Sequence, residues 1–155
     1  MARNTSMDSH QWDSALDPDI APLFLSLQWA QQRSMKTLEP HLQHFKLSIA
    51  ELDVLATLRN APEPHELTPT RIQHHIVITS GGLTKVLLQL EARGLIERSQ
   101  SKEDLRVKPV RLTDSGKAMI EAVMPEVVGA TGAWIRDALT AAEIQQLSAL
   151  LRRLV

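Results

Sequence analysis

Between Thr79 and Arg93 the hydrophobic positions recur with the period of an α-helix. Leucine or valine occupies four positions at the spacing i, i+3, i+4 and i+7, namely Leu83, Val86, Leu87 and Leu90. This spacing places the four side chains on one helix face. Thr79 or Ser80 can accept the first free backbone N–H groups, and Gly94 suits the left-handed residue that follows a helix. The pattern therefore predicts a helix over residues 79–93 with a buried apolar face.

The spacing changes after Gly94, from a period of about 3.6 residues to a period of about 2. Leu95–Ile96 and Val107–Leu112 are predicted to be strands, and the charged stretch 100–104 lies between them. Pro109 lies within the second strand, where its missing N–H donor fits only a sheet edge. A β-hairpin with a charged tip therefore follows the helix.

The polar face of the predicted helix is small, polar or basic near its beginning. Gly81, Thr84 and Lys85 point away from the apolar face, and the free N–H groups of a first helical turn suit phosphate. Residues 68–75 begin with a Thr-Pro pair and form a short helix just before it. Two helices joined by a tight turn, the second with an exposed basic face, are typical of a helix-turn-helix.

Two longer helices are predicted before this region. Residues 20–45 carry a broad apolar stripe, in which Pro40 indicates a break or a kink. Ser48 and Glu51 form a capping box for the second helix, which runs to about Asn60 and is apolar almost all round. We therefore expect the second helix to be buried.

Two further helices are predicted after the hairpin. Thr113 caps the first, in which Pro125 indicates a kink, and Thr140 with Glu143 forms a capping box for the second. The last helix has a stripe of large apolar residues: Ile144, Leu147, Leu150, Leu151 and Leu154. A terminal helix with such a stripe needs another surface to cover it. The predicted fold class is mainly α with a small β-hairpin.

Composition narrows the class of protein. A chain of 155 residues with 43% hydrophobic residues is typical of one folded domain. It has no run of eighteen apolar residues, so we expect no membrane span, and its polar beginning does not resemble a secretory signal. Without cysteine it has no disulfide and no thiol switch. A cytoplasmic location is the simplest expectation.

The formal net charge is −1, but the charges are unevenly distributed. Residues 68–111 contain eight Lys or Arg and four Asp or Glu, whereas residues 1–67 contain five and nine. The positive charge thus coincides with the predicted helix-turn-helix and hairpin, as an anion-binding surface requires.

Several of these segments together resemble the MarR family of winged helix-turn-helix regulators. The resemblance is carried by residues 80–85 (SGGLTK), 90–98 (LEARGLIER) and 112–117 (LTDSGK), with Asp104 and Arg106 before the last of them. It implies a sequence-specific regulator of transcription, usually a repressor released by a small ligand. Its partners would be double-stranded DNA with a palindromic operator and a second copy of the chain.

The resemblance also implies a domain organisation. A polar leader spans residues 1–19, and a single MarR-like domain spans residues 20–155. Within this domain a winged helix-turn-helix lobe occupies residues 48–112. Helical regions at residues 20–45 and 113–155 are expected to interlock two subunits into a homodimer.

Candidate DNA contacts lie on the predicted recognition helix and on the hairpin, which is the wing of the family: Ser80, Gly81, Thr84, Lys85, Lys102, Asp104 and Arg106. Polar and basic side chains suit base edges and phosphates, and Gly81 permits close approach of the backbone. The resemblance implies that Arg106 enters the minor groove and that Asp104 orients basic side chains there. Leu88 also faces outward, either toward a thymine methyl group or packed against the wing.

Residues 51–59, among others, are most similar to the urate-responsive branch of the family. In that branch a tryptophan near the N-terminus, an aspartate on the second helix and an arginine in the recognition helix surround the ligand. Trp12 and Asp53 match the first two, but Val86 stands where the arginine is expected, so an anionic purine lacks its counter-charge. A neutral or cationic aromatic effector, with Trp29 as a further contact, or no effector is the alternative. Asp53 can also be a structural carboxylate bonded to an arginine or to the backbone.

Zinc sensing and catalysis are competing classes of function. His41 and His44 lie three residues apart with Glu39 nearby, and His74 and His75 are adjacent. Their spacing is not that of a regular zinc motif, so we expect surface histidines and no metal or other cofactor. The sequence has no phosphate-binding glycine loop, nucleophile elbow or HExxH motif, which argues against an enzyme. A DNA-binding regulator that needs no ligand is a further alternative.

Overall fold

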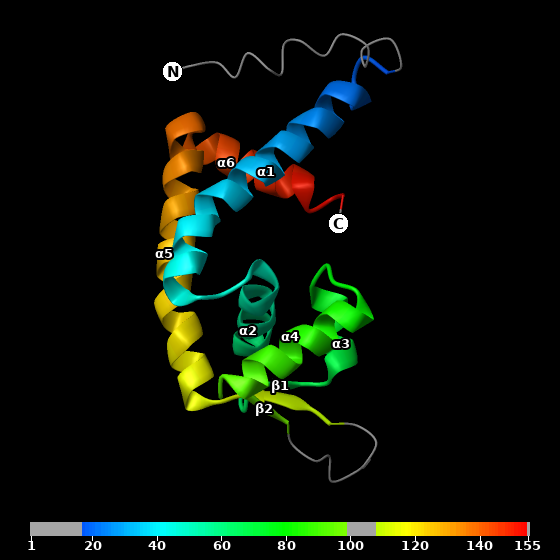
Figure 1. The fold of residues 1–155 in the computed structure, drawn as a ribbon. Coiled ribbons are helices and arrows are strands. Elements are labelled where there is room, and N and C mark those ends of the chain that lie inside the picture. Colours follow the sequence, from blue (N-terminus) through cyan, green and yellow to red (C-terminus); the bar gives the residue numbers. More distant parts are fainter. Residues whose placement is uncertain (1–16, 99–107, 155) are drawn as a thin grey trace. The chain divides into compact units, whose positions relative to one another are not determined.

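The computed structural model describes residues 17–98 and 108–154 (Figure 1). Its elements in chain order are α1 (Ile20–Phe45), α2 (Ile49–Asn60), β1 (Glu66–Leu67), α3 (Pro69–His75), α4 (Ser80–Ala92), β2 (Ile96–Arg98), β3 (Val110–Leu112), α5 (Asp114–Ala138) and α6 (Ala141–Leu151). These elements confirm the predicted fold class, mainly α with a small sheet. The chain forms two compact units, residues 1–39 and 40–155, whose boundary in the sequence lies inside α1.

The first unit contains most of α1. Asp17 starts this helix, because its Oδ1 atom accepts hydrogen bonds from the backbone N–H groups of Asp19 at 3.0 Å and Ile20 at 2.8 Å. The helix runs through Pro40 to Phe45, so the predicted helix is confirmed and, of the break or kink predicted at Pro40, the break does not occur. Several large apolar residues of α1 are exposed: Ile20, Leu23, Phe24 and Leu27.

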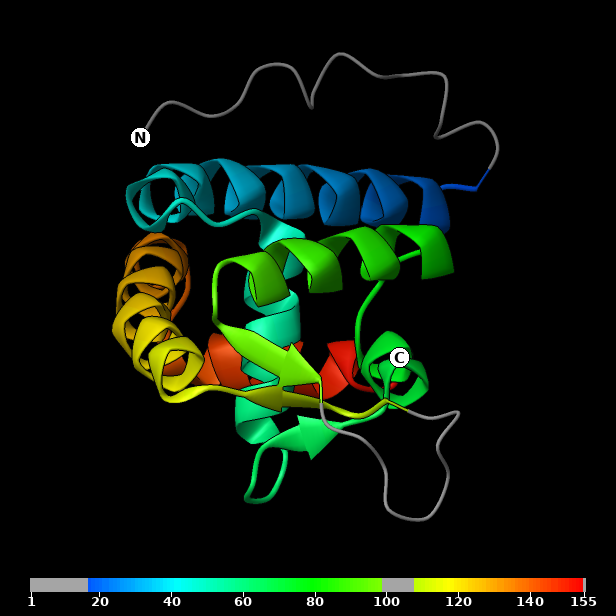
Figure 2. The ribbon, with the colours of Figure 1, turned by 60° about the horizontal axis from the view of Figure 1, so that its bottom comes forward.

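The helix α2 lies at the centre of the second unit, where it contacts α3, α4, α5 and β3 (Figure 2). The predicted capping box between Ser48 and Glu51 is present. Its apolar residues Leu52, Val54, Leu55 and Leu58 are buried. The expectation that the whole helix is buried is wrong at Asp53, which is exposed because it shares the least buried face of α2 with Ile49 and Asn60.

Three short strands form an antiparallel sheet in the order β1-β3-β2. The strands β2 and β3 form the base of the predicted hairpin, with Ile96 opposite Leu112 and Arg98 opposite Val110. The sequence did not reveal β1, because a two-residue strand has no alternation to detect. The strand β3 is central, and Pro109 precedes it, so the edge position expected for a proline within this strand is wrong.

The start of α5 depends on Thr113 and Gly116. Thr113 Oγ1 accepts a hydrogen bond from the Gly116 backbone N–H at 3.0 Å and donates one to the Gly94 carbonyl at 2.6 Å. A Cβ atom on Gly116 would lie 1.9 Å from the carbonyl oxygen of Leu95. The start of α5 can therefore lie this close to Leu95 only because Gly116 has no side chain. The helix then continues through Pro125.

By length and composition alone, α5 would also suit a membrane span. Its residues Ile120, Val123 and Val127 are instead buried in the second unit, and Glu121 and Glu126 are exposed beside them. Part of the apolar surface of α5 is therefore packed within the second unit.

The last helix, α6, has no buried residue. Thr140 and Glu143 form its predicted capping box, in which the Glu143 carboxylate accepts a hydrogen bond from the Thr140 backbone N–H at 2.8 Å. The leucines of its predicted stripe are exposed: Leu147, Leu150, Leu151 and Leu154. No described part of the second unit covers this stripe.

Candidate DNA-binding surface

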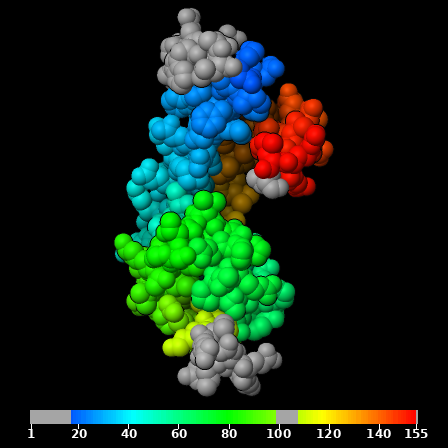
Figure 3. All heavy atoms as spheres, turned by 90° about the vertical axis from the view of Figure 1, so that its right-hand side faces the viewer, coloured from blue at the N-terminus to red at the C-terminus, as the bar shows by residue number. Residues whose placement is uncertain are grey.

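The helices α3 and α4 form the predicted helix-turn-helix and contribute to one face of the second unit (Figure 3). Thr79 caps α4, because its Oγ1 atom accepts a hydrogen bond from the Gly82 backbone N–H at 3.1 Å. Gln73 of α3 donates from Nε2 to Ser80 Oγ at 3.0 Å and to the Ile78 carbonyl at 3.5 Å. These bonds tie the start of the recognition helix to the helix before it.

The two faces of α4 differ as the sequence predicts. Its apolar residues Leu83, Val86, Leu87 and Leu90 are buried. Gly81, Thr84 and Lys85 are exposed, and no atom lies within 4 Å of the position where Gly81 would carry a Cβ atom. Leu88 is 55% exposed, so it is not packed away against the described strands. The exposed face therefore offers a cation, a hydroxyl and an apolar group to whatever approaches α4.

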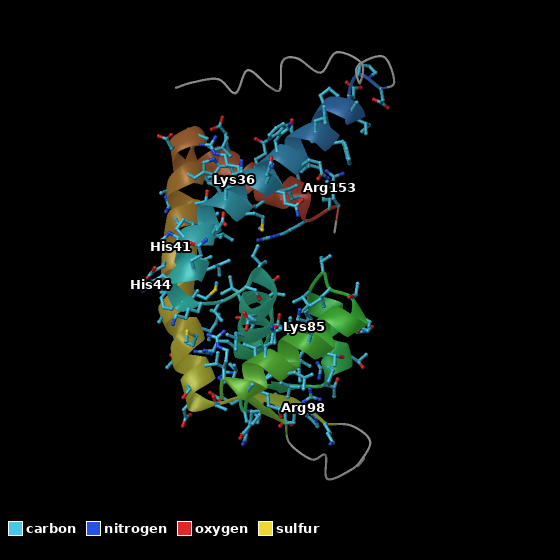
Figure 4. All side chains as sticks on the ribbon, viewed as in Figure 1. Lys36, His41, His44, Lys85, Arg98 and Arg153 are labelled. Carbon is cyan, nitrogen blue, oxygen red and sulfur yellow. The ribbon has the colours of Figure 1, made fainter. Side chains whose placement is uncertain are left out.

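The hydroxyl groups on this face are partly engaged within the protein. Ser80 Oγ exchanges hydrogen bonds with the Gln73 side chain, and Thr84 Oγ1 donates to the Ser80 carbonyl at 3.1 Å. Their oxygens keep acceptor capacity. Lys85, labelled on α4 in Figure 4, makes no ion pair within the described ranges. Its ammonium group is therefore the most available charge on the recognition helix.

Most arginines at the base of the wing are already paired. Arg98, labelled in Figure 4, lies with its Nε atom 3.2 Å from Glu91 Oε2 of α4. Arg111 pairs with Glu97 across the sheet, and this hydrogen bond raises the pKa of the Arg111 guanidinium above its ordinary value. The wing base is thus held to α4 and held together by ion pairs.

The predicted contacts on the wing tip are Lys102, Asp104 and Arg106. They fall within residues 99–107, which lie outside the described part of the chain. These three assignments stay predictions.

Arg71 is a further basic residue of the helix-turn-helix, which its local sequence does not single out. It is exposed on α3 and, among the described residues, its side chain makes no ion pair. The sequence feature that could have identified Arg71 is its position on the solvent face of α3, one turn before His75. Arg71 lines a surface hollow together with residues of α2, among them Thr57 and Asn60.

The four residues predicted to contact a ligand are not all placed relative to one another. Trp12 lies outside the described residues, and Trp29 belongs to the first unit. In the second unit Val86 is buried at 7% exposure, whereas Asp53 is exposed. Two surface hollows of this unit, of about 410 and 380 Å³, are lined by neither of them. The proposed ligand contacts therefore stay predictions.

The described histidines do not gather around a metal position. No group of three His, Cys, Asp or Glu in the described ranges could hold a metal ion. His41 of α1 instead lies with Nδ1 3.1 Å from Glu126 Oε2 of α5.

Asp53 provides a test based on pH. Although it is exposed, partial desolvation raises the pKa of its carboxyl group above the ordinary value of 3.8. A raised pKa in the folded state means that the folded protein binds this proton more tightly, so stability falls as pH rises through the interval between the two values. We expect Asp53→Asn to be more stable than wild type at pH 7 and to lose this advantage near pH 4. Urea unfolding of both proteins between pH 4 and pH 7 measures the difference in their free energies of unfolding. A difference that does not change with pH would contradict the raised pKa of Asp53.

Comparison with known proteins agrees with this geometry. Residues 47–108 match the MarR family. The chain is 32% identical over 121 residues to the HTH-type transcriptional regulator PecS of Dickeya dadantii, covering 76% of this chain and 73% of PecS.

Solved structures show the same fold. A mutant MarR from E. coli, complexed with operator DNA, superimposes with a TM-score of 0.79 at 25% identity, covering 94% of this chain and 99% of that one. BpsR of Bordetella bronchiseptica, whose DNA binding is regulated by 6-hydroxynicotinic acid, gives 0.76 at 26% identity, covering 85% and 97%. The chain therefore belongs to the MarR family of DNA-binding transcriptional regulators.

Proposed function

We propose that this regulator is a homodimeric, cytoplasmic repressor that binds a palindromic operator through α4 and the wing and is released by a small aromatic ligand. The observation that carries the DNA contact is the exposed face of α4. Lys85 is unpaired within the described ranges, and Gly81 leaves the backbone open beside it. A major groove is wide enough for one such helix.

Each candidate residue has a chemical role in this proposal. Ser80, Thr84 and Lys85 contact base edges or phosphates in the major groove, and the backbone at Gly81 approaches the DNA closely. In the wing, Arg106 enters the minor groove, where a guanidinium is favoured. Lys102 contacts phosphate, and Asp104 orients the basic groups around it.

The homodimer is supported by apolar residues that the described parts of each unit leave exposed. On α6 these are the leucines of the terminal stripe, and on α1 they are Ile20, Leu23, Phe24 and Leu27. In a dimer with a two-fold axis, the same surface of each subunit is covered by the other subunit. Such a dimer places two recognition helices about 34–36 Å apart, which matches the two halves of a palindrome one helical turn apart.

The DNA contacts are tested by substitutions on the proposed surface and away from it. We expect Lys85→Ala and Arg106→Ala each to weaken operator binding by about tenfold or more and to reduce the salt dependence by about one unit of slope. Lys36→Ala, an exposed lysine of α1, serves as the control. Fluorescence anisotropy with labelled duplex from upstream of its own gene measures the effect. Equal affinities for Arg106→Ala and Lys36→Ala would remove the wing from the proposal.

The effector is proposed to contact Trp12, Trp29, Asp53 and the region of Val86. The absence of the arginine of the urate-responsive branch at Val86 disfavours urate and favours a neutral or cationic aromatic compound. The regulation of BpsR by 6-hydroxynicotinic acid, an aromatic carboxylate, supports an aromatic effector but not a neutral or cationic one.

Titration of the protein–DNA complex tests the effector. The compounds are purines, phenolic carboxylates, 6-hydroxynicotinic acid and zinc. Release by one of them identifies the chemistry of the effector. A ligand that dissociates the complex must bind the free protein more tightly than it binds the DNA-bound protein. Binding that no compound reverses would favour a ligand-independent regulator, and release by zinc alone would favour the metal-responsive alternative.

A further inference from the structure

Three helix ends meet at the side chain of Arg93. This residue is the C-cap of α4. Its Nη1 atom donates to the Lys46 carbonyl at 2.9 Å and to Glu51 Oε1 at 3.1 Å, and its Nη2 atom donates to the Phe45 carbonyl at 3.5 Å. One guanidinium group therefore joins the end of α4 to the end of α1 and the start of α2.

The groups that Arg93 contacts each need a donor. The last carbonyls of a helix have no partner within that helix, and Phe45 and Lys46 stand where α1 ends. Lys46 has a φ of 53°, the left-handed conformation that turns the chain between the two helices.

Glu51 is only 7% exposed, and its Oε2 atom accepts hydrogen bonds from the backbone N–H and the Oγ of Ser48 at 2.8 and 2.9 Å. Its Oε1 atom faces Arg93. A buried carboxylate needs such a counter-charge, and a planar guanidinium can meet the carboxylate and two carbonyls together.

We infer that Arg93 is a positioning residue for operator recognition, which fixes the tilt of α4 against the α1–α2 junction and so sets the half-site spacing that the dimer accepts. The inference rests on the proposed dimeric binding of a palindrome. Gln73 joins the start of α4 to α3. Arg93 joins the other end of α4 to the junction of α1 with α2.

The size of the effect follows from the length of α4. The helix has 13 residues, which makes it about 20 Å long. A tilt of about 5° about the Arg93 end moves the start of α4, which carries the proposed DNA contacts, by about 1.7 Å, half of the step of about 3.4 Å between base pairs. A small loss of restraint at Arg93 therefore matters to a dimer that must fit two half-sites at once.

Two other ion pairs provide a contrast. Arg98 joins Glu91 of α4 to the sheet, and does not reach the α1–α2 junction. Arg59 pairs with Glu121 at 2.8 Å, which joins α2 to α5 without touching α4. Both side chains in the Arg59 pair are partly exposed, as the Arg93 guanidinium is. Arg59→Gln is thus a control for loss of an ion pair that does not involve α4, with a partner, Glu121, whose side chain is 47% exposed where that of Glu51 is 9% exposed.

The experiment measures discrimination between operator spacings. A palindromic duplex is selected from a random library by the wild-type protein, and versions are made with one base pair inserted or removed between the half-sites. For wild type and Arg59→Gln we expect both changes to weaken binding by about tenfold. For Arg93→Gln we expect weaker binding to the selected duplex and a spacing penalty reduced to about threefold or less. Arg93→Lys, which keeps the charge but not the planar fork, should be intermediate.

Urea unfolding of each variant separates positioning from stability, because a merely destabilised protein binds all spacings less well in the same ratio. A wild-type spacing ratio in folded Arg93→Gln would overturn the inference even if its affinity falls. If Arg93→Gln does not fold, an unchanged ratio in Arg93→Lys has the same meaning. A wild-type protein that binds no palindrome, or is indifferent to spacing, would instead refute the proposed dimeric function.

Discussion

Replacement of Gly116 by alanine is expected to lower the free energy of unfolding by about 3 kcal/mol, near the upper end of typical overpacking effects. The new Cβ atom would lie 1.9 Å from the Leu95 carbonyl oxygen, and this neighbour belongs to the backbone, so rotation of a side chain cannot relieve the clash. The Leu95 carbonyl also accepts a hydrogen bond from the Thr113 backbone N–H at 3.2 Å. Any shift that makes room therefore disturbs the junction between the wing and α5.

The same helix contains a matched control. Gly129 is exposed in α5, and no atom lies within 4 Å of the position of its missing Cβ atom. Alanine there should stabilise the protein by up to about 1 kcal/mol, because glycine is the less favourable residue in a helix interior. Urea unfolding followed by circular dichroism measures both variants. A Gly116→Ala protein as stable as wild type would show that α5 passes Leu95 less closely than described.

The double substitution Leu147→Glu with Leu150→Glu is expected to convert the protein to a monomer and to weaken operator binding by about 100-fold or more. Each buried leucine contributes about 1.5–3 kcal/mol, and a two-fold axis repeats each change on the second subunit. A monomer also loses the second half-site contact, which the dimer gains from its effective concentration. Sedimentation velocity gives the oligomeric state, and anisotropy on the same samples gives the affinity.

Gln145→Glu with Gln146→Glu is the control for this substitution. It adds the same two negative charges to α6 at exposed positions outside the leucine stripe. We expect it to remain a dimer. A Leu147→Glu, Leu150→Glu protein that still sediments as a dimer would place the subunit contact away from α6 and refute that part of the proposed assembly.

Much of the helical structure follows from local sequence. The caps at Ser48, Thr79, Thr113 and Thr140 act over three residues, and the apolar periodicity that follows each of them is local as well. These features predicted α4, with its buried and exposed faces, before any tertiary contact was known.

Features that depend on distant parts of the chain were not predictable in this way. The strand β1 exists because Glu66 and Leu67 pair with β3, more than forty residues later. Asp53 is exposed because the neighbours of α2 leave one of its faces uncovered, which periodicity within an almost wholly apolar helix does not reveal. The contact of Arg93 with Glu51 also joins residues far apart in sequence.

The candidate site likewise combines features that follow from local sequence with features that depend on distant contacts. The exposed face at Lys85 follows from helical geometry alone. The engagement of Ser80 by Gln73 depends on how the turn between α3 and α4 closes, and the sequence indicated only that the turn was short. Arg71 was missed because nothing local distinguishes an arginine facing a ligand from one facing solvent.

The bonds of Thr113 close the wing at its base. Its backbone N–H and its hydroxyl hold Leu95 and Gly94, so the chain leaves α4 and re-enters α5 at one point. A hairpin fastened in this way can lengthen, shorten or exchange its tip without altering the helices on either side. The part of the protein proposed to read the minor groove can therefore diverge faster than the scaffold that presents it, so that new operator preferences can arise while the fold is unchanged.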